Sequence, residues 1–417
     1  MTSKSDGHSE DGSLIAPASA QGGSLAVTLG KNPERIRDHN RRVVLDVVRR
    51  HGPLGRMHIA RLTHLTAQAI ANIVDELVSE NLLMQLGRLK TGRGQPPIQF
   101  AVNPEGAMTI GVEMGSTHMV TTVLDLSGKP RMQHVRPIQD VSPDKLSAQL
   151  RKEVDAMKAS FPARLLGIGV VMPGPFDIEG MSSVGPTTLP GWSGIDAAAV
   201  LSEACGESVL VENDANAAAV GERLFGAGHA ISNFAMIYFG AGIGLGMIQD
   251  GAPFRGAFGN AGEIGHIVIT PNGRSCACGQ KGCLETYASL QTLREKLHAA
   301  GVKDTDFDAL EKLHEDRNPV LMGWVQEAAD HLAPMIAMIE NILDPETIIL
   351  GGMVPDAIID DLIWHMGGLP ISVASRRARA LPRVIRGQTG QFTAALGAAS
   401  LPMFEAMTPK LDTNSEI

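Results

Sequence analysis

Residues 262–285 read GEIGHIVITPNGRSCACGQKGCLE, and they hold three of the four cysteines of the chain within eight positions. A histidine lies ten residues before the first of these cysteines. One histidine and three cysteines make a complete tetrahedral set of zinc ligands, which leaves no coordination position for water. The segment therefore predicts a closed, structural Zn²⁺ site. The expected ligands are His266, Cys276, Cys278 and Cys283.

Chance clustering of cysteines and a disulfide bond are the alternatives to a metal site. A two-residue spacing such as that of Cys276 and Cys278 is too tight for an easy disulfide, and nothing in the sequence indicates secretion. Gly279 and Gly282 let the loop fold back, so that the three sulfur atoms can converge. The pattern favours a metal site.

Two glutamates flank the cluster. Glu263 lies three residues before His266, so the two share a face if this turn is helical, and Glu285 lies two residues after the last cysteine. A metal would fix the loop that carries these two carboxylates and the imidazole, a group that hydrogen-bonds the hydroxyls of a small sugar well. The alternative is that both glutamates are solvated surface charges.

Length and composition place the chain among globular proteins. Its 417 residues suggest two or three domains, and the 44% hydrophobic content and 46 glycines suit an α/β protein with tight turns. No run of about 18 apolar residues predicts a membrane span. The N-terminus lacks the apolar core of a secretory signal, so a cytoplasmic location is expected. Residues 1–30 are polar and aperiodic, which predicts a disordered tail.

A basic module follows this tail. Residues 31–93 contain twelve Lys/Arg and six Asp/Glu, a balance of +6, whereas the whole chain is −9, which leaves −15 for the rest. A basic module attached to an acidic body is the charge pattern expected of a DNA-binding domain. We therefore assign residues 31–104 to such a domain and residues 105–417 to the body.

The periodicity of the module indicates a winged helix-turn-helix. Apolar spacing predicts helices over residues 35–50, with Ile36 on the apolar side, and over residues 56–63 and 67–79. The turn at 64–66 ends in a candidate N-cap threonine. The third helix suits the major groove, and residues 85–102 resemble a β-hairpin wing with a basic tip. A dimerising helical bundle is the alternative. The candidate DNA-contacting residues are Thr66, Gln68, Ala69 and Asn72, with Ile73 on the same face, and Arg88, Lys90 and Arg93 on the wing.

The pattern of the body predicts strands that alternate with helices. Residues 109–117 are expected to form a strand that runs into a glycine turn, and further strands are expected at 165–172, 209–212, 234–239 and 347–350. A helix of small residues is expected at 217–225 and a long apolar helix at 320–343. Such a pattern indicates α/β layers. In these folds ligands bind beyond the carboxyl ends of strands, which is where Asp214 follows the strand at 209–212.

Three motifs of the body resemble the ROK family of repressors, open reading frames and sugar kinases: residues 212–218 (ENDANAA), residues 262–266 (GEIGH), and the Cys-x-Cys-x₄-Cys-x-Glu run. The resemblance covers nearly all of residues 31–403. It implies a two-lobed, actin-like ATPase fold in which Asn213, Asp214, Glu263, His266 and Glu285 line a sugar site. In the kinases the residue matching Asp214 is the general base. The basic module matches the repressor branch, whose members are homo-oligomers, here a dimer or tetramer.

The phosphate side departs from the kinase pattern. Residues 113–117 read EMGST where the kinases carry Asp-x-Gly-Gly-Thr, and residues 240–242 read GAG in place of Gly-Thr-Gly, whereas the family's adenosine turn at Gly351 and Gly352 is kept. Thr187 and Thr188 stand where the kinases have Asn ahead of Leu. We therefore expect a sugar-responsive repressor of carbohydrate genes with no catalytic residue, whose partners are operator DNA and a sugar. The alternative is a sugar kinase with an accessory DNA-binding module.

Overall fold

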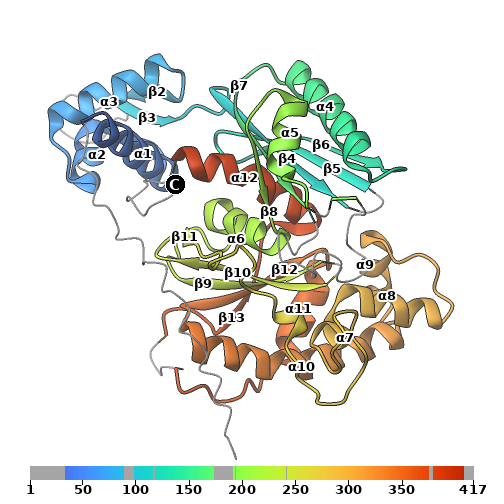
Figure 1. The fold of residues 1–417 in the computed structure, drawn as a ribbon. Coiled ribbons are helices and arrows are strands. Elements are labelled where there is room, and N and C mark those ends of the chain that lie inside the picture. The colour runs from blue at the N-terminus through green and yellow to red at the C-terminus, as the bar shows by residue number, and fades with distance from the viewer. Residues whose placement is uncertain are drawn as a thin grey trace, which may run out of the picture.

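The computed structural model of the 417-residue chain describes residues 33–88, 98–115, 118–172, 191–192, 194–240, 242–374 and 379–407. The predicted tail at 1–30 lies outside these residues. The described chain forms three sheets and the helices around them (Figure 1). Within this part of the chain, no helix is both long and apolar enough to cross a membrane.

The first sheet belongs to a small N-terminal module, drawn in blue in Figure 1. Helices α1 (Pro33–His51), α2 (Arg56–Thr63) and α3 (Ala67–Ser79) pack on a sheet of order β1-β3-β2. Its pairs are antiparallel, and the strands are β1 (Leu54–Gly55), β2 (Leu83–Arg88) and β3 (Ile98–Val102). These elements confirm the helices, the turn and the two strands of the wing that the sequence predicts, whereas the wing tip lies outside the described residues.

The second sheet has the order β6-β5-β4-β7-β8. Its meander of β4 (Ala107–Met114), β5 (His118–Asp125) and β6 (Pro130–Pro137) is antiparallel. Strands β7 (Arg164–Val171) and β8 (Val209–Glu212) join parallel to β4 and to each other. Parallel strands need crossover connections, which contain α4 (Pro143–Ser160) and α5 (Ala197–Cys205). The carboxyl ends of β4, β7 and β8 therefore share one edge.

The third sheet has the order β11-β10-β9-β12-β13. Strands β9 (Phe234–Phe239), β10 (Ile243–Gln249) and β11 (Ala252–Pro253) form an antiparallel meander, and β12 (Thr347–Gly352) and β13 (Val384–Arg386) add parallel strands. The predicted long helix is α10 (Pro319–Leu343). Its core-facing side, which includes Trp324, is buried against this sheet. The remaining elements are η1 (Ile264–His266), α7 (Glu285–Ala288), α8 (Leu290–Ala299), α9 (Phe307–Glu315), α11 (Asp356–His365) and η2 (Gly390–Phe392).

Two helices of small residues, α6 (Asp214–Phe225) and α12 (Thr393–Met407), lie between the two larger sheets (Figure 1). Glycines allow the close approach. A Cβ on Gly169 of β7 would lie 1.8 Å from the carbonyl oxygen of Ala398, and one on Gly246 of β10 would lie 2.2 Å from that of Ala215. Any side chain at these glycines would push a helix off its sheet, so α6 and α12 are fixed in the centre of the body.

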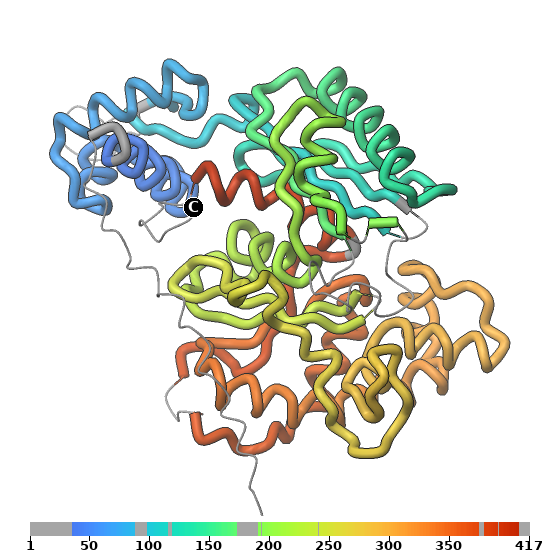
Figure 2. The backbone as a smooth tube through the Cα atoms, viewed as in Figure 1, coloured from blue at the N-terminus to red at the C-terminus, as the bar shows by residue number. Residues whose placement is uncertain are grey.

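The N-terminal module packs on this central pair of helices, as the tube in Figure 2 shows for α1 and α12. The buried cluster of the module includes Val44 and Val48 of α1 together with Met403 and Met407 of α12. The guanidinium of Arg49 donates a hydrogen bond of 2.7 Å to the carbonyl oxygen of Leu224 in α6. The module thus shares a hydrophobic core with the body.

Three details differ from the sequence-based predictions. Helix α6 begins at Asp214, three residues before the predicted start, because Asn213 caps it. Ile73, expected on the DNA-facing side of α3, is buried in the module's core. Ile36, expected on the apolar side of α1, is exposed. A helical wheel cannot show which neighbour covers a face, and this explains both side-chain errors.

Candidate functional site

The predicted metal ligands converge. The ligand atoms of His266, Cys276, Cys278 and Cys283 all lie within 4.8 Å of one another. Short antiparallel bridges, Val268 with Cys283 and Ser275 with Lys281, close the loop that carries the cysteines.

A glycine makes this closure possible. Gly282 has φ +89°, and a Cβ there would lie 1.7 Å from the carbonyl oxygen of Thr270. A side chain at this position would therefore open the loop and separate the sulfur atoms. One imidazole and three thiols are the donor set of a closed tetrahedral site, so these residues fit a zinc ion.

Glu285, the first residue of α7, lies directly against this cluster. Its Oε1 accepts a hydrogen bond of 2.9 Å from the thiol of Cys276 and lies 3.3 Å from Nδ1 of His266. Glu263 occupies the N-cap position of the short helix that carries His266, and its side chain makes no capping hydrogen bond there. Burial raises the pKa of the Glu263 carboxyl, and Glu285 adds to the rise while His266 opposes it. The two predicted glutamates therefore border the cluster and are close enough to interact.

The other predicted sugar residues come from the start of α6, directly after β8. The side-chain oxygen of Asn213 accepts hydrogen bonds from the backbone amides of Ala215 (2.9 Å) and Asn216 (3.4 Å), which satisfies two N–H groups of the first helical turn. The side-chain oxygen of Asn213 is thus used for capping, and its amide NH₂ group is the part suited to a ligand.

Asp214 links the two halves of the site. Burial raises the pKa of Asp214 to about 6, the Ala215 amide opposes the rise, and the charge of Glu263 adds to it. A Cβ on Gly240 would lie 3.1 Å from Oδ2 of Asp214, and one on Gly242 would lie 3.1 Å from Oε2 of Glu285. The glycine turn between β9 and β10 therefore lies against both carboxylates and connects the start of α6 to the cysteine cluster.

Two buried groups complete this acidic site. Oε2 of Glu113, near the end of β4, is shielded from solvent and has no hydrogen-bond partner among the described residues. Burial raises the pKa of Glu113 to about 7, and the charge of Asp214 adds to the rise. The hydroxyl of Tyr238 on β9 has its pKa raised by burial and by the same two carboxylates. The sequence motif assigns Glu113 to the phosphate side, whereas Tyr238 gives no signal in the sequence because it lies within an apolar strand.

The predicted DNA-contacting residues lie on α3 and at its start. Thr66 is the N-cap of α3, and its hydroxyl accepts a hydrogen bond of 3.2 Å from the amide of Ala69. Gln68 and Asn72 are exposed one turn apart, and the side chain of Gln68 donates to that of Asn72 at 3.0 Å. Lys90 and Arg93 lie outside the described residues, and only the backbone position of Arg88, at the end of β2, is described.

The basic excess of α1 is used inside the protein. Arg41 pairs with Glu76 and Glu80 of the α3 region, and Arg49 and Arg50 pair with Asp46. These guanidinium groups hold the module together and join it to the body. Net charge alone could not distinguish this use from contact with phosphate.

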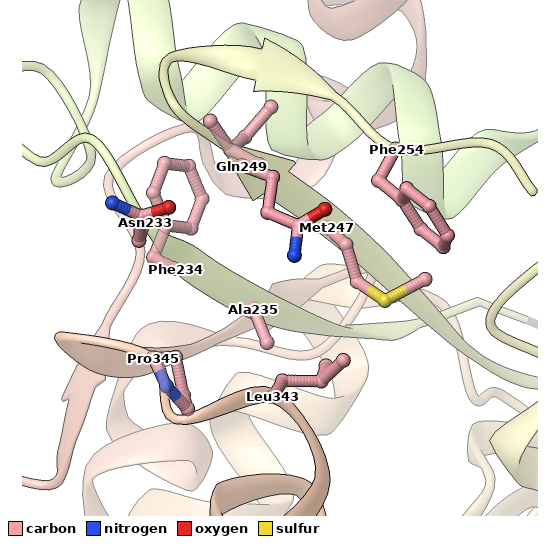
Figure 3. Close-up of a pocket in the computed structure, with 9 residues that line it drawn as sticks. Asn233, Phe234, Ala235, Met247, Gln249, Phe254, Leu343 and Pro345 are labelled. Atoms are coloured by element: carbon pink, nitrogen blue, oxygen red, sulfur yellow. The ribbon is translucent and has the colours of Figure 1, made fainter.

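A separate, small hollow of about 20 Å³ lies where the β9–β10 end of the third sheet meets the end of α10 and the chain after it (Figure 3). Its lining is mostly apolar, and none of the predicted sugar or metal residues contributes to it. It is lined by Asn233, Phe234, Ala235, Met247, Ile248, Gln249, Phe254, Leu343 and Pro345.

Comparison with known proteins agrees with this geometry. The family model described as "ROK family" matches residues 109–403. The xylose repressor of Bacillus subtilis (strain 168) is 27% identical over 373 residues, which cover 88% of this chain and 95% of that protein. The DNA-binding transcriptional dual regulator NagC of Escherichia coli (strain K12) is 24% identical over 340 residues, which cover 78% and 83% of the two chains.

Solved structures with the same fold include regulators and kinases. A ROK family transcriptional regulator, described as a homologue of the E. coli MLC protein, matches with a TM-score of 0.69 at 22% identity and covers 89% of this chain and 98% of its own. A ROK family glucokinase from Streptomyces griseus, in complex with glucose and AMPPNP, matches with a TM-score of 0.56 at 26% identity and covers 70% and 98%.

Proposed function

From the premise that this chain belongs to the ROK family, we propose that it is a sugar-responsive transcriptional repressor. The observation that carries the proposal is one chain in which a helix-turn-helix with an exposed α3 surface is docked on a body that carries the residues expected to bind a sugar. The family model begins at residue 109, after this module. We place the boundary between the DNA-binding domain (31–104) and the sugar-binding body (105–417) a few residues before the start of this match.

The exposed start of α3 supports DNA binding. Side chains of the Gln and Asn type read adenine edges in the major groove, and Gln68 and Asn72 are exposed there. Arg88, Lys90 and Arg93 of the wing would contact phosphates or a minor groove. In a homo-oligomer, paired modules require a palindromic operator with half-sites about one helical turn, or a multiple of it, apart.

Operator contact is tested with a matched pair of variants. Gln68→Ala should relax the base preference of binding, measured by fluorescence anisotropy on a library of operator variants. Gln326→Ala is the control, because Gln326 is also exposed on a helix and donates a hydrogen bond to the residue four positions later. Arg93→Ala should weaken binding to all sequences and flatten its salt dependence. Unchanged base preference in Gln68→Ala would contradict this use of α3.

The acidic site supports sugar binding. Asn213, Asp214, Glu263, His266 and Glu285 offer amide, carboxylate and imidazole groups that hydrogen-bond hydroxyls, and a zinc ion bound by His266 and the three cysteines would fix the loop that carries Glu285. A thermal-shift panel of D-xylose, D-glucose and N-acetyl-D-glucosamine tests this, because a ligand that binds the native state raises the melting temperature. No shift with any of these sugars would count against the proposed site.

Helix α6 supports communication between the two sites. Asp214 is its first residue, and at its last turn the carbonyl oxygen of Leu224 accepts from Arg49 of α1, whose guanidinium lies 5.6 Å from the ring centroid of Phe225. Twelve residues span about 18 Å. A sugar that moves the start of α6 would thereby move α1. The sugar changes operator affinity only by its differential affinity for the two arrangements, about 1–3 kcal/mol in typical cases.

We further propose that the protein does not phosphorylate its sugar at a useful rate. Glu113 is one methylene longer than the aspartate of the kinases, which displaces its carboxylate by about 1 Å, and such a misplacement costs about a hundredfold in rate. Ala241, outside the described residues, has no hydroxyl to offer a phosphate. The kinase alternative is tested by ADP release with ATP, Mg²⁺ and a sugar that binds. Turnover of about 1–1000 s⁻¹ that Asp214→Asn abolishes would establish the kinase instead.

A further inference from the structure

The carboxylate of Glu212, the last residue of β8, organises the start of α6. Its Oε1 accepts hydrogen bonds from the backbone amide of Asn213 at 3.0 Å and from the side-chain amide of Asn216 at 3.1 Å. Only 7% of Glu212 is exposed. Because Asn213 is one of these donors and Asp214 lies between it and Asn216 in the chain, the orientation of Glu212 sets the path of the backbone that presents Asn213 and Asp214.

The other oxygen of this carboxylate, Oε2, is ion-paired with Nε of Arg255. Arg255 belongs to the opposite half of the body, since it follows β11 at the edge of the third sheet. Its carbonyl oxygen accepts a hydrogen bond of 3.1 Å from the amide of Ala261 and so closes the loop just before Glu263. One arginine therefore connects the segment that presents Asp214 to the loop that leads into Glu263 and His266.

The loop that Arg255 closes is held in place from its other end. Gly262 has φ +103°, and a Cβ there would lie 2.0 Å from the carbonyl oxygen of Leu245, so the backbone presses directly on β10. The amide of Leu245 donates to the carbonyl oxygen of Gly262 at 2.9 Å. The loop is therefore fixed at both ends, so a shift of Arg255 would also shift Glu263.

The two side chains of the Glu212–Arg255 ion pair differ in how much they are exposed to solvent. The Glu212 side chain is 8% exposed, whereas that of Arg255 is 42% exposed. A carboxylate buried without a cation is costly, so Arg255 holds Glu212 in its accepting orientation. The exposure of Arg255 means that substituting it removes this effect without opening a cavity in the core.

We propose that Arg255 is a positioning residue of the sugar site, which holds its two halves in register through Glu212. This inference rests on the proposed sugar binding. Arg255 is not expected to touch the sugar, and its substitution should weaken sugar binding by about 10-fold to 100-fold, the range in which loss of a supporting partner weakens a ligand site.

The test compares sugar dissociation constants by calorimetry, with the sugar that gives the largest thermal shift in the panel above. Arg255→Gln should weaken sugar binding and leave the metal content unchanged, and it should also lower the melting temperature without sugar, because the buried Glu212 carboxylate loses its cation. Arg255→Lys should restore part of the affinity. The matched control is Arg386→Gln on β13, because Arg386 is similarly exposed and pairs with Asp356 and Asp360, which are not part of the site.

A double-mutant cycle shows whether the effect passes through the carboxylate. The effects of Arg255→Gln and Glu212→Gln should be strongly non-additive, because each removes the same ion pair. If the wild-type protein binds sugar and Arg255→Gln binds it equally well, the inference is wrong and the proposed function stands. If the wild-type protein binds none of the sugars, the proposed function fails and the inference fails with it.

Discussion

At its first turn, helix α6 is surrounded by carboxyl groups, whereas at its last turn it is surrounded by guanidinium groups. The charge of Glu263 acts on Asp214, and the charge of Asp214 acts in turn on Glu113. Those that act on Arg223, in the last turn, are Arg50, Asp46 and Arg49 of α1. Both sets agree with the helix dipole, which favours negative charge at the N-terminus and positive charge at the C-terminus.

The two ends differ in what could relieve their like-charge repulsion. The acidic end borders the candidate sugar and metal site, where a ligand with hydroxyl donors would satisfy carboxylate oxygens such as Oε2 of Glu113, which lacks a partner among the described residues. The basic end is a joint between the module and the body, where Asp46 pairs with Arg49 at 2.9 Å and with Arg50 at 2.7 Å. We therefore expect a ligand to stabilise one end and the DNA-binding domain the other.

The largest expected effect comes from removing the metal beside the acidic end. Cys278→Ser should abolish metal binding, measured by elemental analysis, and with it sugar binding, because Glu285 would lose the loop that positions it. Operator affinity without sugar should be kept, since the joint between α1 and α6 contains none of the cluster residues. Cys205→Ser is the control, because Cys205 is a buried cysteine of α5 outside the cluster. Absence of zinc from the wild-type protein would refute the assignment.

The second effect is a pH dependence of stability at the acidic end. The pKa of Glu113 is raised from 4.5 to about 7, so the native state binds more protons than the unfolded state between these values. The stability contributed by protonated Glu113 is therefore complete below about pH 4.5 and is lost as the pH rises through 7. Glu113→Gln should remove this loss, which amounts to at most about 3 kcal/mol.

Melting temperatures measured from pH 4.5 to 8 check this prediction. Relative to the values at pH 4.5, the melting temperature of Glu113→Gln should exceed that of the wild-type protein increasingly as the pH rises. Glu311→Gln, a substitution of an exposed glutamate on α9, should leave the wild-type profile unchanged. Parallel profiles for wild type and Glu113→Gln would show that Glu113 is not under the repulsion described here.

A third, smaller effect concerns the basic end and the coupling of sugar to operator. Arg49→Met should leave the sugar dissociation constant unchanged and reduce the effect of saturating sugar on operator affinity from about 5–150-fold towards none. The control is Arg42→Met, because Arg42 also reaches from α1 to a backbone carbonyl of the body, that of Glu405 on α12. Equal loss of coupling in both variants would show that the connection is not specific to α6.

The sequence predicted the contents of the acidic end far better than those of the basic end. His266, the three cysteines and Glu285 fall within twenty residues, so their spacing alone indicates that they meet. Arg49 and Leu224 are 175 residues apart, and Arg255 and Glu212 are 43 residues apart. Contacts of this kind depend on how whole elements pack, which local periodicity does not encode. The same limit explains why helical periodicity misplaced Ile73 and Ile36.

The smallest expected effect is that of Arg223→Met, although Arg223 is only 4% exposed. Burial lowers the pKa of Arg223 to about 10, and Arg50 contributes to this. Among the described contacts, its guanidinium donates one hydrogen bond, of 3.2 Å, to the carbonyl oxygen of His229. Loss of a hydrogen bond of this kind costs about 1.5–3 kcal/mol, but replacing a buried charge that faces like charges by an apolar side chain returns a similar amount. The melting temperature should therefore change by no more than about 2 °C.

Asp46→Asn provides the contrast, since it removes the carboxylate that both Arg49 and Arg50 use, and it should be clearly destabilising. If Arg223→Met lowers the melting temperature as much as Asp46→Asn, the basic end carries no surplus charge and the contrast between the two ends of α6 is lost.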